Sequence, residues 1–443
     1  MTREPSTPIT PNSGSAGTKR RRFIVLCPHF APDIAPTGRV MTQLVDEWVA
    51  LGHEVHVITA LPWYRDHRVE QGWRGRLVRR ERTAWGSITR VHPFPAKSKS
   101  NLVARAFAFM LFSSIAGICA LIVGRPNSRL VVGRPNSRRA RVDAVIAMSP
   151  PLTLGIVGWL AAVGRRTRLI FNVQDVFPDA VIKTGAVKSR VLISLASRLE
   201  RFTYQRASAV AVLSSDLQRN VRAKLPVGFA DRVHVIENFV NTQRVAPLDR
   251  HTTYRRELGL GDEVVVMYAG NVGFSQSLDT LIAAARRLPQ ISFVINGAGA
   301  ALAHVKDLSR DLANVHFGDY QPEVRLAEVL ASADIHVVPL RAGLAEVSVP
   351  SKTYSILAAG RCVVAAVDRG TQIERLITQA NAGVCVQPDD VDALVSALAD
   401  LANDATRRTT LGSNGRTFIE RHPSARHAAE SYVRLVPDSL SDS

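Results

Sequence analysis

The stretch PLRAGLAEVSVPSKTYSILAAG, residues 339–360, decides how the second half of the chain folds and where that half would bind a ligand. It follows the apolar run 333–338, which predicts a buried strand, and it ends in a helix rich in small residues. Between them lie Glu346 and the triplet PSK, which ends in Ser351 and Lys352. If Ser351 caps the helix, the first-turn amides and the Lys352 ammonium point to one spot, which predicts an anion site suited to a diphosphate. The alternative is an ordinary loop with a solvated lysine.

Short apolar runs alternate with helical patterns on both sides of this stretch. In the first half they are residues 23–27, 55–59, 142–147 and 169–173, and in the second half residues 264–269, 291–296, 315–317, 363–367 and 383–386. A strand, a loop, a helix and a second strand within about forty residues form a βαβ unit. The sequence therefore predicts α/β architecture with parallel sheets and right-handed crossovers.

The length of 443 residues is too great for one ordinary core, so two domains are expected. Residues 242–257 are polar and basic without a strand pattern, and we interpret them as the interdomain linker. The predicted divisions are a disordered tail (1–22), a first domain (23–241), a second domain (242–415) and a C-terminal helix and tail (416–443). The last segment is expected to pack back toward the first domain.

The charge balance of 56 Lys and Arg against 38 Asp and Glu favours a polyanion or an anionic membrane surface as partner. The four cysteines are widely spaced without a CxxC pair, which predicts buried free thiols in a reducing cytosol. The apolar run 23–27 stops at Pro28, too early for a signal peptide.

Residues 106–123 carry no charge over 18 positions, and by length they could cross a membrane. A single span would place strands of one parallel sheet on opposite sides of the bilayer. We therefore expect segment 102–123 to hold a helix that packs on the sheet and dips one face into the cytoplasmic leaflet. Charged substitutions at Phe109 and Leu111 should then release the protein from liposomes. The alternative is a crossover helix that is wholly buried in the protein. We assign no function to the tandem repeat of VGRPNSR that begins at residue 123.

Several residues follow strands in positions where ligands bind. Asp175 comes directly after the run 169–173, and open α/β sheets bind ligands at the carboxyl ends of their strands. Gly38 follows the first strand, where a glycine lets a ligand approach the backbone or simply permits a turn. The GxG at 297–299 is a weak dinucleotide signal. The DxD at 390–392 begins an amphipathic helix, which explains its acids without a metal.

Five sequence motifs occur in this order between residue 23 and about residue 421: PHFAPDIAPTG, MSPPLT, FNVQDVFPD, YAGNVGFSQSLDTL and GLAEVSVPSKTYSILAAG. Together they resemble bacterial retaining glycosyltransferases of family 4, in the branch of the fucosamine and colanic-acid fucosyl transferases. The resemblance implies the GT-B fold, two Rossmann-like parallel-sheet domains facing a central cleft. It also implies a sugar nucleotide bound mainly by the second domain, an acceptor bound mainly by the first, and retention without a metal or other cofactor.

The resemblance further implies roles for individual residues. Lys352 and the helix amides would stabilise the leaving diphosphate, Glu346 would hydrogen-bond the donor sugar, and Asp175 would orient the reacting sugars. The donor would also contact Gly38, Asn271, Gly273, Gln276, Gly297, Tyr320, Arg341, Ser351 and Ser355, with Tyr320 near the base. Asn271 and Gln276 stand where many members carry Arg and Lys. Ser355 aligns with a glutamate that usually holds two ribose hydroxyls, and a serine can hold only one.

These features predict a cytoplasmic enzyme, peripherally associated with the inner membrane, that serves envelope polysaccharide synthesis. It would move a hexosyl or acetamido-hexosyl group from a nucleotide sugar to a lipid-linked or glycolipid acceptor. One alternative is a sugar-nucleotide epimerase of the same architecture, which would act without an acceptor lipid. Another is a catalytically degenerate paralogue, suggested by Ser355. A nucleic-acid binder rests on the basic pI alone, because the sequence has no helix-turn-helix or zinc pattern.

Overall fold

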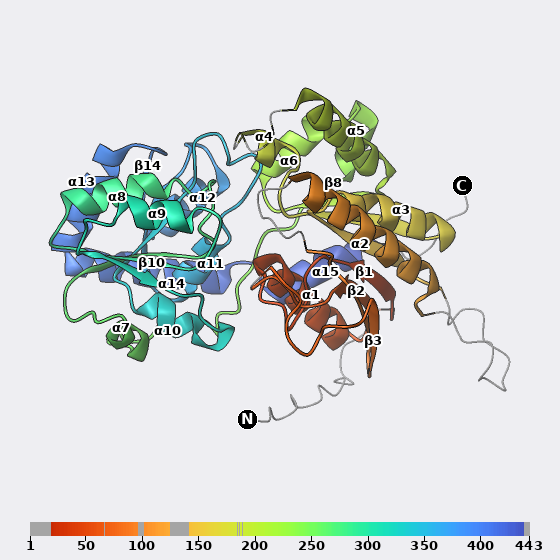
Figure 1. The fold of residues 1–443 in the computed structure, drawn as a ribbon, viewed down its shortest axis with the longest axis horizontal. Helices are drawn as coiled ribbons and strands as arrows, with labels where there is room; N and C mark the ends of the chain where they lie inside the picture. Colours follow the sequence, from red (N-terminus) through yellow and green to blue (C-terminus); the bar gives the residue numbers. More distant parts are fainter. Residues whose placement is uncertain are drawn as a thin grey trace.

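The computed structural model describes residues 19–65, 67–95, 102–124, 141–183, 185, 187 and 189–437. It contains two α/β domains, each built on its own sheet, which confirms the predicted GT-B architecture (Figure 1). Most of the predicted N-terminal tail and of the VGRPNSR duplication lies outside the described residues.

The first sheet has the strand order β3-β4-β2-β1-β5-β6-β7-β8, and all its neighbours are parallel except the β3–β4 hairpin. Its strands are β1 (Arg22–Leu26), β2 (Glu54–Ala60), β3 (Val78–Thr83), β4 (Gly86–Val91), β5 (Ala144–Ser149), β6 (Arg168–Val173), β7 (Ala209–Val212) and β8 (Val233–Val235). Its helices are α1 (Pro36–Ala50), α2 (Leu102–Ile122), α3 (Thr153–Gly164), α4 (Asp179–Lys183), α5 (Arg190–Arg206) and α6 (Ser215–Ala223), with the 3-10 helix η2 (Val227–Arg232). The central strands are buried on both faces, which explains their continuous apolar sequences.

The second sheet has the order β11-β10-β9-β12-β13-β14 and is parallel throughout. Its strands are β9 (Val265–Ala269), β10 (Ser292–Asn296), β11 (Val315–Gly318), β12 (Ile335–Pro339), β13 (Cys362–Ala366) and β14 (Gly383–Val386). Its helices are α7 (Thr253–Glu257), α8 (Leu278–Arg287), α9 (Leu302–Leu308), α10 (Leu326–Ala331), α11 (Lys352–Ala358), α12 (Gln372–Ala380), α13 (Val391–Asn403) and α14 (Ala405–Arg421), with the 3-10 helix η3 (Glu323–Arg325). The last helix of the chain, α15 (Ala425–Arg434), follows them. The strand order reverses between β9 and β12, and open α/β sheets bind ligands at such a switch point.

Some local elements differ from the sequence patterns. Helix α1 begins at Pro36, where proline suits the first helical position, so Gly38 lies inside its first turn. Strand β7 and helix α6 were missed. The four residues of β7 include two alanines, a residue depleted in strands, so the run carries a weak strand signal. Helix α7 lies in the basic run 242–257, which was interpreted as the interdomain linker.

Helix α2 packs on the first sheet beside α3, as predicted (Figure 1). Phe112, Ala116 and Ala120 are buried in the core, whereas the side chains of Phe107 and Ile118 are 63% and 58% exposed. The alternative of a wholly buried helix is therefore wrong. Among the described residues, α2 is the one helix long and apolar enough to cross a membrane.

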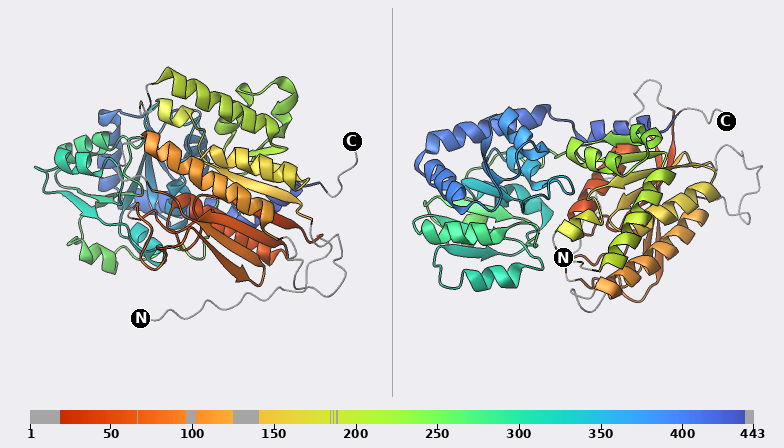
Figure 2. Two further views of the ribbon diagram at one scale, coloured as in Figure 1. Left: turned by 45° about the vertical axis from the view of Figure 1, so that its right-hand side comes forward. Right: turned by 90° about the horizontal axis from the view of Figure 1, so that it is seen from above.

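The last helix, α15, lies on the first domain against α1 (Figures 1 and 2). The indole nitrogen of Trp48 donates a hydrogen bond of 3.0 Å to the Ala429 carbonyl, and Trp48 packs edge to face on Tyr432. The chain therefore crosses between the domains once before β9 and again after α14.

A buried carboxylate joins the domains beside these crossings. Asp216, in the first turn of α6, accepts a hydrogen bond of 2.6 Å from the backbone amide of Gln372, the first residue of α12. The guanidinium of Arg375 lies 3.3 Å from the same carboxylate, which is almost fully buried. One first-domain side chain thus satisfies donors at the start of a second-domain helix.

We expect Asp216→Ala to weaken the coupling between the domains. It leaves the Gln372 amide and the Arg375 guanidinium without this acceptor, at a cost of about 1–3 kcal/mol. Differential scanning calorimetry should then show a lower Tm for at least one domain and a broader or split transition. Asp262→Ala is a matched surface control, because its carboxylate is 94% exposed. Identical melting curves for Asp216→Ala and the wild type would contradict the role of Asp216.

Candidate functional site

The loops after β9 and β10 are joined by backbone hydrogen bonds at the switch point of the second sheet. The amide of Gly270 donates to the Asn296 carbonyl, and that of Val272 donates to the Ala298 carbonyl, both at 2.9 Å. Gly297 has a φ of +145°, and a Cβ on it would lie 1.9 Å from the Gly270 carbonyl oxygen. Glycine is therefore required at 297 by the adjacent backbone.

Lys352 lies against this loop pair. Its ammonium sits 3.6 Å from the centre of the Tyr268 ring, and a Cβ on Gly270 would lie 3.1 Å from it. The side chain as a whole is half-buried, but the nitrogen is sealed from solvent and has no hydrogen-bond partner. Burial lowers the pKa of Lys352 well below its usual value. An unpaired buried amine destabilises the fold, and an anionic partner would reverse that penalty.

The helix that Lys352 begins departs from the sequence prediction. Ser351 stands at the N-cap position of α11, but its side chain accepts no capping hydrogen bond. The amides of Thr353 and Tyr354 donate instead to the carbonyls of Pro350 and Ser351, at 3.2 and 3.3 Å. The prediction that Ser351 caps the helix is therefore wrong, because the chain turns into α11 through backbone bonds. The candidate anion site rests on the Lys352 ammonium.

Asp175 lies at the contact between the two domains. Its backbone forms an antiparallel bridge with Ser348, and the next amide, that of Val176, donates a 2.8 Å hydrogen bond to the Val347 carbonyl. Burial raises the pKa of the Asp175 carboxyl, and a hydrogen bond from the Ser348 side chain offsets part of that rise. The first domain thus contacts the loop that connects β12 to Lys352.

Glu346 lies in the same loop, two residues before Ser348. Its side chain is 56% exposed, and its carboxylate lies 3.7 Å from the Lys183 ammonium of α4. Lys183 also donates a 2.7 Å hydrogen bond to the Gly343 carbonyl. The structure therefore brings Asp175 and Glu346 to one interdomain contact, together with Lys183, which sequence reasoning missed.

The expected donor-binding residues after β9 form a connected layer. The side-chain oxygen of Gln276 accepts from the Gly273 amide at 3.0 Å, and the Tyr268 hydroxyl donates to the Asn271 carbonyl. The Arg341 amide donates to the Ser275 carbonyl at 2.9 Å, which ties the loop after β12 to the loop after β9. The loops after β9 and β12 are therefore tied together at the switch point. Ser355 lies further along α11, and its side chain is half-buried.

Gly38 is buried, and a Cβ on it would lie 2.9 Å from the Cβ of His29. Close packing against the loop that contains His29 therefore explains why position 38 is a glycine. Its neighbour Arg39 contacts the second domain, with its guanidinium 5.9 Å from the centre of the Tyr320 ring and 4.0 Å from the Glu323 carboxylate. Tyr320 therefore faces the first domain.

The DxD acids have structural partners. Asp390 caps α13 by accepting a 2.9 Å hydrogen bond from the Ala393 amide, as the sequence predicted. Asp392 forms an ion pair with Arg287. Within the described ranges, no three His, Cys, Asp or Glu side chains gather in a way that could hold a metal ion.

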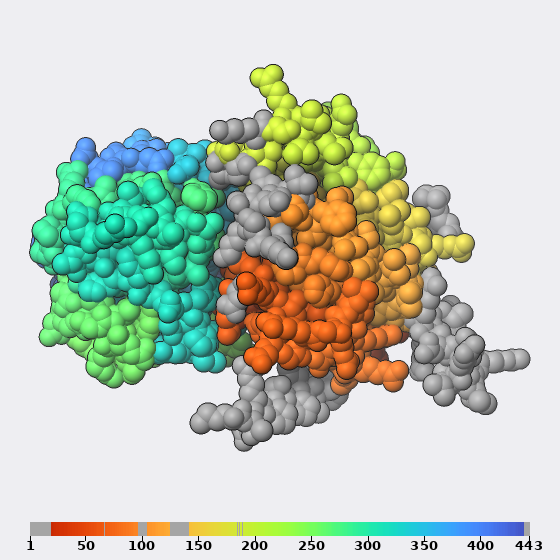
Figure 3. All heavy atoms as spheres, in the orientation of Figure 1, coloured from red at the N-terminus to blue at the C-terminus, as the bar shows by residue number. Residues whose placement is uncertain are grey.

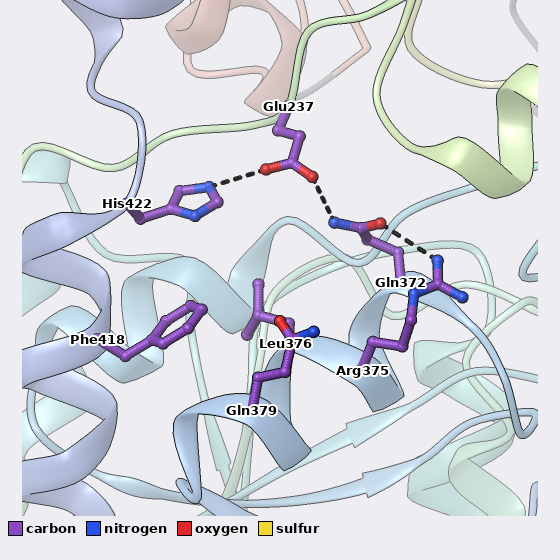
Figure 4. Close-up of a pocket in the computed structure, with 7 residues that line it drawn as sticks. All are labelled: Glu237, Gln372, Arg375, Leu376, Gln379, Phe418 and His422. Atoms are coloured by element: carbon purple, nitrogen blue, oxygen red, sulfur yellow. Dashed lines mark hydrogen bonds and ion pairs between the residues drawn. The ribbon is translucent and has the colours of Figure 1, made fainter.

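A cavity of about 360 Å³ lies where the chain crosses between the two domains (Figure 4). Its walls come from the crossing before β9, α12 and α14, and they consist of Glu237, Gln372, Arg375, Leu376, Gln379, Phe418 and His422. Glu237 accepts a 2.6 Å hydrogen bond from Gln372 and lies 3.6 Å from His422. None of the expected site residues lines this cavity, and its polar groups largely bond to one another.

The two halves of the chain match two family models. Residues 37–238 match the glycosyl transferase 4-like domain, and residues 263–404 match glycosyl transferases group 1. The chain is 27% identical over 394 residues to the putative colanic acid biosynthesis glycosyl transferase WcaI of Escherichia coli, covering 85% of this chain and 91% of that protein. It is 24% identical to the probable glycosyltransferase WbjE of Pseudomonas aeruginosa, over 79% and 84% of the two chains.

Solved structures show the same fold. The sucrose-phosphate synthase of Thermosynechococcus elongatus superposes with a TM-score of 0.72 at 19% identity, covering 94% of this chain and 98% of that one. Anabaena HepE in complex with UDP-glucose superposes with a TM-score of 0.66 at 14% identity, covering 93% and 98%. The chain therefore belongs to the glycosyltransferases that join a glycosyl transferase 4-like domain to a group 1 glycosyl transferase domain in the GT-B fold.

Proposed function

We propose that the protein transfers a sugar, with retention and without a metal, from a nucleoside-diphosphate sugar to a lipid-linked or glycolipid acceptor in envelope polysaccharide synthesis. The observation that carries the proposal is the sealed, unpartnered Lys352 ammonium at the switch point between β9 and β12. A nucleotide diphosphate supplies the anion that such a group favours. The colanic acid relative and the UDP-glucose complex of HepE support the substrate classes.

In this proposal the bound diphosphate favours the charged form of Lys352, and Lys352 stabilises the negative charge that develops on the leaving group. Glu346 leaves its exposed ion pair with Lys183 and accepts hydrogen bonds from hydroxyls of the donor sugar. Asp175, held by Ser348, orients the sugars at the interdomain contact. The layer of Asn271, Gly273, Gln276, Gly297 and Arg341 surrounds the phosphates. The donor further contacts Gly38, Tyr320, Ser351 and Ser355.

A donor screen followed by a transfer assay tests this function. Thermal shift with UDP-glucose, UDP-N-acetylglucosamine, UDP-N-acetylfucosamine, GDP-mannose and GDP-fucose should identify a stabilising donor. Its radiolabelled sugar should then move to bacterial membrane lipids, and NMR of the product should show the donor's anomeric configuration. Conversion of the donor to an epimer without lipid would favour the epimerase. Inverted product would contradict retention.

We further propose that α2, α3 and α5 rest on the anionic inner leaflet. The three helices lie side by side on the first domain, and Figure 3 shows part of the surface that α2 contributes (orange). Their large exposed apolar side chains are Phe107, Met110, Ile118 and Ile122 of α2, Leu160 and Val163 of α3, and Val191, Leu192 and Leu195 of α5. Cations such as Arg105 and Arg190 accompany them, which suits anionic headgroups.

We expect Phe107→Asp and Ile118→Asp each to weaken vesicle binding about tenfold, because each removes a large apolar side chain from the proposed lipid contact. Phe109 and Leu111 are half-buried, so the exposed pair replaces them as test positions. Sedimentation with phosphatidylglycerol–phosphatidylethanolamine vesicles measures the effect. Leu308→Asp, on α9 of the second domain, is the matched control. Unchanged binding by both α2 variants would contradict the membrane contact.

A further inference from the structure

A buried carboxylate holds an imidazole at the switch point of the first sheet. The strand order reverses between β1 and β5, and His29 lies just beyond the carboxyl end of β1. The Nδ1 of His29 is 2.7 Å from Oδ2 of Asp33, whose side chain has no exposed surface. The other oxygen of Asp33 accepts from the Tyr64 amide at 3.2 Å. Since a carboxylate accepts, Nδ1 carries the hydrogen that joins the pair, and Nε2 is the nitrogen left to contact a ligand.

The ring is held on three sides. Trp63 stacks on it with ring centres 5.6 Å apart and planes at 23°, and Tyr64 meets it edge on at 5.4 Å. Gly38 lies so close that a Cβ there would be 2.9 Å from the Cβ of His29. The imidazole keeps 12% of its side-chain surface exposed, and its Nε2 bonds to none of the described residues. A fixed orientation with one unused, unsealed nitrogen is what a ligand contact requires.

One aromatic neighbour of His29, Tyr64, lies near tyrosines of the second domain. Burial raises the pKa of Tyr64 to about 12, and the nearby phenol of Tyr320, in the second domain, adds to that rise. Burial likewise raises the pKa of Tyr268, and the nearby phenols of Tyr320 and Tyr64 add to that rise. Tyr268 is the ring on which the Lys352 ammonium rests. Tyr64, the edge-on partner of His29, therefore lies near the second-domain tyrosine that contacts the Lys352 ammonium.

We propose that His29 binds the acceptor. Its Nε2 accepts a hydrogen bond from an acceptor hydroxyl, Asp33 positions the ring, and Trp63 and Tyr64 offer apolar surface to a pyranose. The inference rests on the proposed function and extends it, because it assigns an acceptor contact in the first domain. No covalent bond is made or broken at His29.

Two substitutions separate this role from a purely structural one. His29→Asn keeps a polar group near the position of Nδ1, where it can reach Asp33, but leaves nothing at Nε2. His29→Gln places its amide near Nε2 instead. We expect the Asn variant to raise the KM for octyl pyranoside acceptors about tenfold with the donor KM unchanged, and the Gln variant to stay within about threefold of the wild type. His304→Asn is the matched control, since His304 pairs with Asp279 at 3.2 Å on the surface.

A structural role predicts the opposite order, with Asn tolerated and Gln defective, and that result would overturn the proposal. Equal acceptor KM values in all variants would overturn it too. Binding can also be read without turnover, by titrating octyl glucoside, galactoside and mannoside into protein labelled with ¹⁵N-histidine. We expect the Nε2 signal of His29 to shift and that of His304 to stay; no shift at His29 contradicts the acceptor contact. Binding at His29 without transfer from any donor contradicts the proposed function instead.

Discussion

Lys352→Met is expected to lower the rate of sugar transfer by about 10²–10³ and at the same time to stabilise the unliganded protein. Methionine keeps the apolar contact with the Tyr268 ring and removes an amine that is sealed from solvent without an acceptor. Removing that unsatisfied group should raise the free energy of unfolding by about 1–3 kcal/mol. Loss of a single group that stabilises the leaving group typically lowers kcat by about 10²–10³. The opposite signs of the two effects distinguish a ligand-binding lysine from a structural one.

The pH dependence of stability provides a second signature of Lys352. Burial lowers its pKa in the folded protein, so between that pKa and the ordinary value of 10.5 the unfolded chain binds more protons than the folded one. This group's contribution to the free energy of unfolding therefore rises with pH across that window. The stabilisation by Lys352→Met should accordingly be greatest at the low-pH end and shrink toward pH 10.5.

Urea denaturation at several pH values measures these changes, and Lys306→Met is the matched control. The Lys306 ammonium lies 5.3 Å from the centre of the Phe317 ring but at the surface of α9. We expect the control to change neither stability by more than about 0.5 kcal/mol nor transfer. A less stable Lys352→Met protein with normal turnover would show that the lysine supports the fold and not the donor.

Gly297→Ala is expected to disrupt the donor site through the backbone. The new Cβ would lie 1.9 Å from the Gly270 carbonyl oxygen, and the φ of +145° is a conformation that alanine rarely adopts. The loop after β9 must then move, and it carries the backbone against which the Lys352 ammonium rests. We expect a loss of about 3 kcal/mol or more in the free energy of unfolding, together with loss of donor-induced thermal shift.

Gly259→Ala separates the effect of a positive φ from the effect of the close contact between Gly297 and Gly270. Gly259 also has a positive φ, of +72°, but no atom lies within 4 Å of its Cβ position. It should therefore lose only about 1–2 kcal/mol and keep its response to the donor. Equal losses in both variants would mean that backbone conformation alone matters, and that the contact between Gly297 and Gly270 does not determine the donor site.

The alternation of apolar runs and helical patterns predicted both parallel sheets apart from strand β7, because a parallel strand that is buried on both faces has a continuous apolar sequence. Lys352 was found by its place between a buried strand and a helix. The sequence did not show that the Lys352 ammonium is sealed from solvent, because Tyr268 and Gly270, which contact it, lie at the end of a different strand. The ion pair between Lys183 and Glu346 joins the two domains, and no local sequence pattern predicts such a contact. The Ser351 cap failed because backbone bonds at Pro350 replaced it.

The His29–Asp33 pair could have been found from the sequence. Its spacing of four residues in PHFAPD places an imidazole and a carboxylate within reach in a tight loop after a strand. The partners that hold the ring, Trp63 and Tyr64, follow the next strand and meet it only in the folded sheet. Nearness in sequence can thus suggest a pair, while its orientation depends on the tertiary structure.

The most direct test of the central claim is the initial rate of nucleoside diphosphate release with and without membrane lipid, for the wild type and Lys352→Met. Each donor from the screen is supplied with a bacterial lipid extract. We predict that the wild type releases nucleoside diphosphate from one donor only when lipid is present, and that Lys352→Met lowers this rate by about 10²–10³. Lipid-dependent release at the same rate in both proteins would contradict the assignment of Lys352 as the diphosphate-binding residue.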